Sequence, residues 1–430
     1  MKRSPVRPKH AVAQTVSLFA VTVAALAGCT VDGHAVNDAD PAANASVDLK
    51  SLDTGKYPTA PRPQFGKAGK DDIIPFETQR MTQYIVAPFE VDPDMTAMGR
   101  PTQVMWAGSG NLKTVLDDQV AGVKGNDEVI YGYVVSASTP DETIRTGDRR
   151  EMNHFVARYP TPAAASTAVK QMSDEYAKEP GVTEVHPAGM SESRVFSKPS
   201  WKEGFSGTAS FTAHGVYGIY TYYMATDAHK DQIEPAIRKA TSLQVPLIDK
   251  FPASPTNDEV AAGTRPKQNL IMDQNHILIY ALPYSDDEIK NHQYDATNQG
   301  NIRAVYGPRG MSFRSTDPAE DFALLTEVGS TANAVEKTTV YRASTPEGAT
   351  KIMNTFQNQN RSRGMKPLAA PPNLPVARCL TKATDGVTAY WCAVQVGRYF
   401  ADLSGTDLKD VYQQTSAQYV ILTKADQKAN

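Results

Sequence analysis

Apolar residues recur at helical spacing in two distant segments, and both segments open with the same Thr-Pro pair. Thr161-Pro162 and Thr345-Pro346 each place an N-cap side chain before a proline at the first helical position, where the missing N–H costs nothing. Behind each pair, apolar residues at i, i+3, i+4 and i+7 form one stripe. These stripes are Ala165, Ala168, Val169 and Met172, and Ala349, Ile352, Met353 and Phe356. The pattern predicts two helices that each bury one face.

These helices are the middle of three matches that favour an internal duplication. Residues 84–89 and 279–284 each read as an apolar strand that ends at Pro-aromatic. Near the end of each copy, a shift of 179 residues without a gap places Tyr220 on Tyr399. Because all three matches occur in the same order, the chain is predicted to contain one unit twice.

The order of elements in each copy predicts an α+β fold. Strands alternate with one-sided helices, and each copy ends in a hairpin and a last helix, at residues 228–243 and 408–422. We expect two tandem related domains, residues 73–250 and 267–425, each an antiparallel or mixed sheet with helices packed on a face. The proline-rich residues 251–266 between them are expected to be a linker.

The N-terminus has the layout of a lipoprotein signal peptide. Basic residues precede an uncharged apolar run that ends in Leu26-Ala27-Gly28-Cys29, the sequence of a lipobox. We expect removal of residues 1–28 and acylation of Cys29 with chains such as palmitate, each bound to the bilayer at about 0.8 kcal/mol per methylene. The alternative is an ordinary signal peptide followed by a chance cysteine. Lipidation would hold the protein on the extracytoplasmic face of the cell membrane.

Residues 29–72 read as a flexible tether between this anchor and the folded body. A small, polar stretch is followed by Pro58, Pro61 and Pro63, which favour extended conformations. Beyond the signal peptide, no uncharged apolar run approaches the roughly 20 residues of a membrane span.

Charge and motif content narrow the expected partners. The net charge is −3 and no basic tract occurs, so no nucleic acid is expected. The chain also lacks a phosphate-binding glycine loop and the spacings of metal ligands, so no cofactor and no metal are expected. The remaining partners are the membrane, through the acyl anchor, and an unidentified ligand or protein of the cell envelope.

Two cysteines besides Cys29 are expected to form a disulfide. Cys379 and Cys392 flank an Asp-Gly pair, which is a strong hairpin turn signal, and an oxidising compartment would join them across the hairpin. A metal or redox pair would instead need cysteines two residues apart with further ligands nearby. At the shift of 179 the two cysteines align with Ser200 and Ala213, so no disulfide is expected in the equivalent hairpin of the first copy.

No residue pattern in the sequence identifies a catalytic site. The sequences around Ser109 and Ser206 lack one or both glycines of a nucleophile turn. Asp92 and Asp94 do not continue into a calcium loop. The histidines of the body show no metal-binding pattern and are read as surface or strand-end residues: His154, His186, His214, His229, His276 and His292. We therefore expect that the protein is not an enzyme.

A tyrosine-rich strand is the most unusual candidate for a ligand-binding surface. Alternation sends Tyr217 to one face of the sheet, and Tyr220 and Tyr222 to the other. Because tyrosine rings are amphipathic, these three residues could line a groove for an acyl chain or a sugar. The alternative is a central strand buried on both faces.

Two parts of the chain resemble known families. The opening segment contains Asp48-Leu49, Leu52-Asp53-x-Gly55 and Tyr57-Pro58-Thr59-x-Pro61-Arg62, and the late hairpin contains Cys379, Tyr390, Trp391, Cys392 and Gly397 to Tyr399. Both resemble a family of actinobacterial lipoproteins of unknown function, which implies two α+β units behind a proline-rich start. The Thr-Pro helix with its Trp/Cys hairpin also resembles the extracytoplasmic sensor domains of actinobacterial receptor kinases. Neither resemblance implies catalytic residues.

Together these features predict a lipid-anchored, extracytoplasmic module that binds a ligand or a protein in the cell envelope. Duplicated domains often form a cleft between them, which is where a ligand would sit. One alternative is an envelope hydrolase whose active site the patterns do not reveal. Another is a lipid carrier, which would need a continuous apolar cavity.

Overall fold

The computed structural model describes residues 46–99, 103–106, 112–199, 203–294 and 302–429. The expected signal peptide, Cys29 and Ser109 lie outside these residues. Their predicted roles stay predictions.

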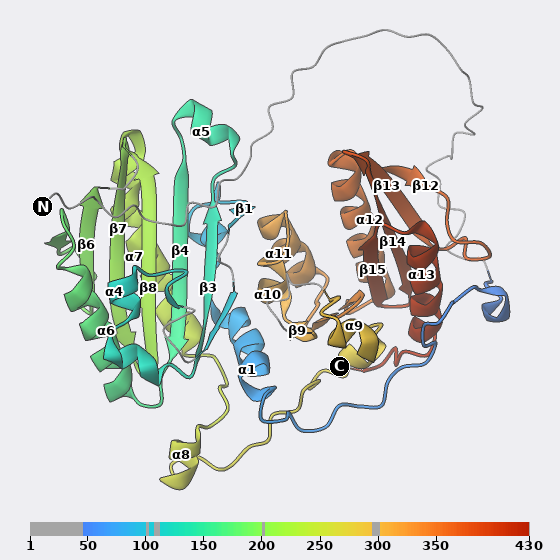
Figure 1. Ribbon diagram of the computed structural model, residues 1–430, viewed down its shortest axis with the longest axis horizontal. Helices are drawn as coiled ribbons and strands as arrows, with labels where there is room; N and C mark the ends of the chain where they lie inside the picture. The colour runs from blue at the N-terminus through green and yellow to red at the C-terminus, as the bar shows by residue number, and fades with distance from the viewer. Residues whose placement is uncertain (1–45, 100–102, 107–111, 200–202, 295–301, 430) are drawn as a thin grey trace, which may run out of the picture. The chain divides into compact units, whose positions relative to one another are not determined.

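The N-terminal half is built on an antiparallel sheet with the order β1-β3-β4-β8-β7-β6-β5, in which β2 also pairs with β3 (Figure 1). Helix α6 (Pro162–Tyr176) covers one face, where Tyr220 lies, and α7 (Ile233–Ile248) covers the other. The strands are β1 (Ala97–Met98), β2 (Gln103–Trp106), β3 (Tyr131–Ser138), β4 (Arg150–Arg158), β5 (Thr183–Val185), β6 (Ser193–Pro199), β7 (Phe205–His214) and β8 (Tyr217–Thr226). Shorter helices are α1 (Ile73–Met81), α2 (Pro88–Val91), α4 (Asp118–Ala121), α5 (Glu142–Thr146) and α8 (Asn257–Ala261).

The C-terminal half is built on a second antiparallel sheet with the order β12-β13-β14-β15-β11-β10-β9. Helices α12 (Pro346–Ser362) and α13 (Leu408–Leu422) pack on its opposite faces. The strands are β9 (Ala304–Tyr306), β10 (Asn333–Val335), β11 (Thr339–Arg342), β12 (Lys366–Leu368), β13 (Arg378–Thr384), β14 (Val387–Val396) and β15 (Tyr399–Gly405). Short helices α9 (Asp286–Lys290), α10 (Pro308–Ser312) and α11 (Pro318–Glu327) complete this half.

The two halves share one strand order, which confirms two tandem related α+β units. The path β3-β4-β8-β7-β6-β5 corresponds to β10-β11-β15-β14-β13-β12. The Thr-Pro helices are also equivalent, because Thr161 and Thr345 each accept a hydrogen bond at 3.1 Å from the backbone N–H three residues on.

The register of the duplication differs from the prediction at the last hairpin. Each hairpin closes through a two-residue turn that begins with a glycine at φ +54°, Gly215 and Gly397. Immediately after the turn, Tyr217 pairs with the last residue of β4, and Tyr399 pairs with the last residue of β11. Tyr399 is therefore equivalent to Tyr217, and its predicted match to Tyr220 is three residues out of register. The strand is rich in tyrosine, so similarity alone aligns at several offsets, whereas the turn fixes one.

The corrected register also moves the cysteines. Cys379 on β13 pairs with Cys392 on β14, and the equivalent pair in the N-terminal half is Val195 and Ser210. The earlier match to Ser200 and Ala213 was wrong for the same reason. It remains true that the first copy carries no cysteine at either position.

The predicted strands at residues 84–89 and 279–284 are not strands. Each segment instead begins within a short 3₁₀ helix, η2 (Thr82–Tyr84) or η5 (Leu278–Tyr280). A side chain of the last helix takes the place of a neighbouring strand. Gln244 of α7 donates to the carbonyl oxygen of Tyr84 at 2.9 Å, and Gln418 of α13 donates to that of Tyr280 at 2.9 Å.

In each case the glutamine oxygen also accepts from the backbone N–H two residues farther on, at 2.9 Å for Gln244 and 3.2 Å for Gln418. The buried backbone groups are thereby satisfied without a sheet. This shared glutamine clamp is further structural support for the duplication.

His154 belongs to this clamp and is not a surface histidine. It is fully buried on β4, with Nε2 at 2.8 Å from the Gln244 oxygen and Nδ1 at 2.9 Å from the hydroxyl of Thr221. In the C-terminal half Thr338 donates to Gln418 from the same position, at 2.6 Å. Burial lowers the pKa of His154 to about 4, so the ring is neutral near pH 7.

This depressed pKa predicts acid sensitivity. Below pH 6.5 the unfolded chain takes up a proton at His154 that the folded chain resists until about pH 4, so stability falls by up to about 3 kcal/mol over that range. His154→Thr introduces the residue found at the equivalent position, Thr338. It should lower the free energy of unfolding at every pH and make that free energy less dependent on pH. Urea unfolding at pH 4.5 and 7 measures both proteins, and equal pH dependence in the two would contradict the prediction.

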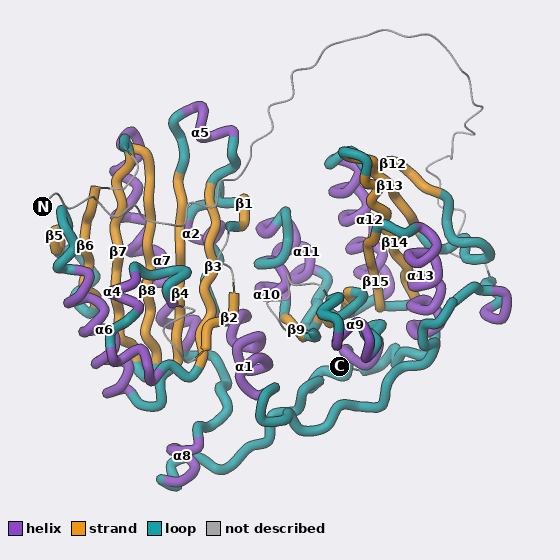
Figure 2. Tube along the Cα trace, in the orientation of Figure 1, coloured by secondary structure: helices purple, strands orange, loops and turns teal. Residues whose placement is uncertain are grey.

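The expected flexible tether is ordered in its second part. Residues 46–68, which we call the strap, run along the C-terminal half, mostly as loop apart from η1 (Leu49–Ser51) (Figure 2). Leu52 and Tyr57 are buried in the core around α13, and the hydroxyl of Tyr57 donates to Asp410. Lys67 forms a bridge with Ile271. The prolines keep this segment extended, and its apolar side chains find a core in the other half of the chain.

The last helix of each half was located with different success. Helix α13 has the predicted bounds. Helix α7 begins later than predicted, after the 3₁₀ turn η4 (Asp227–Gln232), and continues through Pro246. Pro246 lies in the last turn of α7, where a missing N–H removes only one helical hydrogen bond.

Candidate ligand-binding site

A polar cavity of about 340 Å³ lies on the α12 face of the second sheet. All its lining residues belong to the C-terminal half rather than to a cleft between domains. The cavity volume is at the lower end of the range for small-molecule sites. The lining comprises Met311, Arg314, Ser315, Thr316, Asp321, Leu325, Tyr341, Phe356, Gln359, Asn360, Trp391, Asp402 and Ser404.

Asp402 is placed in this cavity by β15. Alternation along the strand puts it on the same face as Phe400, and the indole N–H of Trp391 on β14 donates to Asp402 Oδ2 at 3.0 Å. Asp402 is half-buried because it borders the cavity, but the surrounding protein excludes most of the water from its carboxyl group. This burial raises the pKa of Asp402 to about 6; the nearby charge of Asp321 adds to the rise and the Trp391 hydrogen bond opposes it.

Asp321 is the second carboxylate of the site. It lies in the first turn of α11 and is 7% exposed. Its two oxygens accept hydrogen bonds from Gln359 Nε2 at 2.8 Å and from the hydroxyl of Ser315 at 2.5 Å. Burial raises the pKa of Asp321 above its ordinary value, and the two hydrogen bonds oppose that rise.

Neither carboxylate has a cationic partner among the residues that the structure describes. The groups that donate to Asp321 and Asp402 are a hydroxyl, an amide and an indole, all neutral. Arg314 borders the same cavity, and its guanidinium carbon lies 5.7 Å from the ring centre of Tyr306. The cavity therefore concentrates negative charge when both aspartates are ionised.

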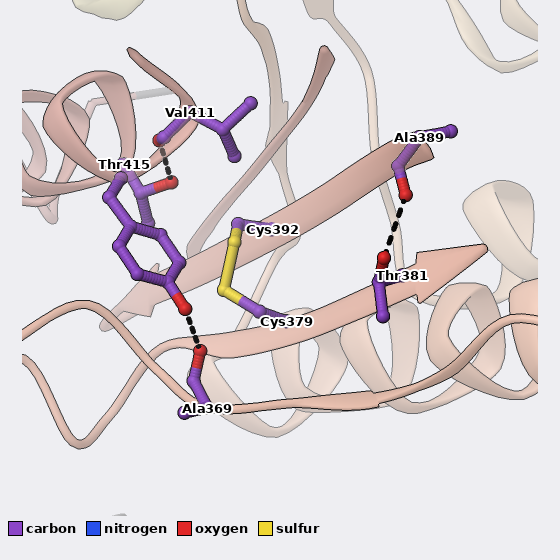
Figure 3. The surroundings of a disulfide bond; sticks show 8 residues. Ala369, Cys379, Thr381, Ala389, Cys392, Val411 and Thr415 are labelled. Atoms are coloured by element: carbon purple, nitrogen blue, oxygen red, sulfur yellow. Dashed lines mark hydrogen bonds between the residues drawn. A yellow bond between two sulfur atoms is a disulfide. The ribbon is translucent and has the colours of Figure 1, made fainter. Parts of the chain in front are cut away.

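The predicted disulfide is confirmed (Figure 3), and it lies on the α13 face of the sheet, opposite the face that carries the cavity. Cys379 and Cys392 are a directly opposed pair on β13 and β14, with Cα atoms 4.2 Å apart. They face α13, where they pack with Leu403 and Val411. Because Trp391 precedes Cys392, the bond fixes the strand pair at the point where the indole enters the cavity.

Removing this disulfide should weaken the C-terminal half selectively. Cys379→Val with Cys392→Ser supplies the residues found at the equivalent positions of the N-terminal half. Loss of a loop closure of this length should cost about 3 kcal/mol. Hydrogen exchange should increase in β13 and β14 but not in β6 and β7. Unchanged exchange in β13 and β14 would contradict the prediction.

The N-terminal half has aromatic rings at four positions equivalent to residues in or next to the cavity lining. Helix α6 contributes Tyr176, strand β7 contributes Phe211, and strand β8 contributes Tyr220 and Tyr222. The ring centre of Phe211 lies 5.4 Å from that of Tyr176 and 5.1 Å from that of Tyr220. In the C-terminal half every one of these positions is smaller or more polar. The equivalent pairs are Tyr176 and Asn360, Phe211 and Ala393, Tyr220 and Asp402, and Tyr222 and Ser404.

The three tyrosines proposed from the sequence lie elsewhere. Tyr217 and Tyr220 are 8% and 6% exposed and face opposite sides of the first sheet, as the alternation predicted. Tyr222 is half-buried and packs beside Tyr220. The buried-strand alternative therefore describes Tyr217 and Tyr220, and none of the three lines the cavity.

The other sequence candidates have structural partners. Ser206 donates to Asp227 at 2.8 Å. Asp92 and Asp94 pair with Arg150 at 2.9 and 2.6 Å. Within the described residues, no group of three or more His, Cys, Asp or Glu side chains is arranged to hold a metal ion. None of the described helices is both long and apolar enough to cross a bilayer.

Fold and cavity together define a duplicated α+β protein with a polar cavity in its second unit. Comparison with protein families places the chain more narrowly. Residues 65–262 match the N-terminal part of the domain of unknown function DUF7373, and residues 285–425 match its C-terminal part. The two matches span more than half of the chain, which therefore belongs to this family. The resemblance to a two-domain family of unknown function is thus confirmed, and the cavity lies within the C-terminal match.

One solved structure that the comparison matches is the extracellular domain of PknH from Mycobacterium tuberculosis. The two chains are 12% identical with a TM-score of 0.28, over 42% of this chain and 98% of the PknH domain. A search of curated proteins found no match.

Proposed function

We propose that this protein is an extracytoplasmic binding module, anchored through Cys29, that takes a small ligand into the cavity beside Asp402. The cell envelope would supply the ligand. Binding, rather than catalysis, is the proposed activity.

The observation that carries this proposal is the contrast between the two copies of the fold. At four equivalent positions one copy has aromatic rings, whereas the other has smaller or more polar side chains beside a cavity and places a carboxylate with a raised pKa at its wall. Side chains that line a cavity lose packing contacts on the open side, and burying a carboxylate without a cationic partner costs further free energy. Such costs are typically retained where a site has a function.

Two further features support an extracytoplasmic location. The lipobox at Cys29 predicts export and anchoring. The disulfide between Cys379 and Cys392 is the kind of bond that persists in oxidising compartments. The polar lining, with two carboxylates, favours a polar ligand over the acyl chain that a lipid carrier would hold.

The test is to purify the protein without its acyl chains from its own envelope and to measure bound small molecules by native mass spectrometry. Ser404→Tyr, copied from Tyr222, should fill the cavity mouth and abolish the bound mass. Ala389→Tyr adds the same ring on the exposed end of β14, outside the cavity, and should leave it unchanged. The same bound mass in all three proteins, or none in any, would refute the proposal. Turnover of p-nitrophenyl esters or glycosides that Ser404→Tyr abolishes would show catalysis instead.

A further inference from the structure

We infer that the ligand of the C-terminal cavity carries a protonated amine, which binds between the carboxylates of Asp402 and Asp321. This inference rests on the proposed function, because it names the ligand class of the same cavity.

The first reason is that the two buried glutamates among the described residues pair with arginines, although the fully buried Asp273 accepts hydrogen bonds from two backbone N–H groups instead. Glu77 is 1% exposed and pairs with Arg80; Glu336 is 5% exposed and pairs with Arg62 at 2.5 Å. Asp321 and Asp402 receive only neutral donors among the described residues. Buried charges are normally paired, and Arg314, which also lines the cavity, can balance only one of the two carboxylates, so one positive charge is left for a ligand to supply.

The second reason is the mutual effect of the two aspartates. Each carboxylate is destabilised by burial, and the charge of Asp321 further raises the pKa of Asp402. A cation placed between them would lower the energy of both ionised forms at once. A neutral polyol would donate hydrogen bonds but would leave the repulsion in place.

The third reason is the wall of the cavity. Tyr341, Phe356 and Trp391 line it together with the carboxylates. Aromatic rings beside carboxylates attract organic cations through the ring quadrupole. A calcium ion would require six to eight oxygen ligands, whereas this lining combines two carboxylates with rings, hydroxyls, side-chain amides and the guanidinium of Arg314.

The test compares two probes of nearly equal shape, n-butylammonium and neutral 1-butanol, by calorimetric titration of the acyl-free protein. At pH 7.5 butylammonium should bind at least about tenfold more tightly than butanol. Lowering the pH to 5.0 should weaken its binding about tenfold, because Asp402, with a pKa of about 6, is then only about one-tenth ionised.

Variants separate the carboxylate from the shape of the cavity. Asp402→Asn keeps the shape and should remove both the preference for butylammonium and its pH dependence. Asp385→Asn is the matched control, because Asp385 is an exposed carboxylate in the β13–β14 turn, outside the cavity. It should bind butylammonium like the unaltered protein, and far-UV circular dichroism checks that both variants fold.

The outcomes distinguish this inference from the proposed function. Any of four results would overturn the inference that the ligand carries a protonated amine. Butylammonium and butanol could bind equally, glucose or calcium chloride could bind more tightly, butylammonium could fail to bind, or its binding could be unaffected by Asp402→Asn. If native mass spectrometry still shows a bound molecule that Ser404→Tyr displaces, the proposed function stands without it. If no bound molecule is found either, both fail.

Discussion

Deletion of the strap, residues 46–68, is expected to unfold the C-terminal half of the protein. Leu52 and Tyr57 are buried in the core around α13, and each large-to-small change at such a position costs about 2–5 kcal/mol. The hydroxyl of Tyr57 also donates a hydrogen bond to Asp410 in the first turn of that helix. The free energy lost by deleting the whole segment therefore approaches the total stability of a domain, about 5–15 kcal/mol.

This expectation is tested by comparing urea unfolding of chains that begin at residue 46 and at residue 69. A synthetic peptide of residues 46–68 should restore the shorter chain. Among point variants, Leu52→Ala should be strongly destabilising, while Leu49→Ala, at a residue 39% exposed, serves as control. Equal stability of the two chain lengths would show that the strap contributes little.

Asp402→Asn is expected to stabilise the protein at neutral pH while removing its proposed ligand contact. The folded-state pKa of Asp402 is raised from 3.8 to about 6, so the folded protein holds this proton more tightly than the unfolded chain. Its contribution to stability is fully present below pH 3.8 and is lost as pH rises through 6. The variant escapes that loss, which amounts to about 3 kcal/mol.

The measurement is the free energy of unfolding of both proteins from pH 3.5 to 7.5. The difference in favour of Asp402→Asn should be near zero at the acid end and grow to its full size by about pH 7. An aspartate kept for its structural role would give the opposite sign, with Asn destabilising at neutral pH. That result would contradict the argument that Asp402 lowers the stability of the folded protein in return for ligand binding.

Local signals in the sequence predicted much of the fold. The Thr-Pro pairs located α6 and α12, because the cap and the proline act within one helical turn. The Asp-Gly turn located the β13–β14 hairpin, and with it the disulfide. Both devices depend on neighbours in the sequence, so they can be read without the fold.

Features that depend on distant partners were missed. The segments before Pro88 and Pro283 looked like strands, because their backbone partners are the side chains of Gln244 and Gln418. The strap looked like a linker, because its core belongs to another part of the chain. In both cases the residue types of the segment could be interpreted, but nothing in the sequence indicated the distant residues against which the segment packs.

The cavity was missed through the three-residue error in register. At the predicted offset Tyr220 matches Tyr399, and the copies look alike. At the offset that the hairpins impose, Tyr220 meets Asp402 and Tyr222 meets Ser404. A position where one copy has a buried ring and the other a carboxylate is the sequence signal that would have indicated the site. It becomes readable only once the turn has fixed the alignment.

The strap also sets the order in which the chain can fold as it is made. Tyr57 and its partner Asp410 are 353 residues apart, so the strap leaves the ribosome long before the helix against which it packs. Until α13 has emerged, Leu52 and Tyr57 have no core to enter and remain open to other contacts. The N-terminal half can assemble earlier, but closure of the C-terminal half waits until α13 has been made. Contacts of such long range slow folding and leave apolar side chains exposed in its intermediates.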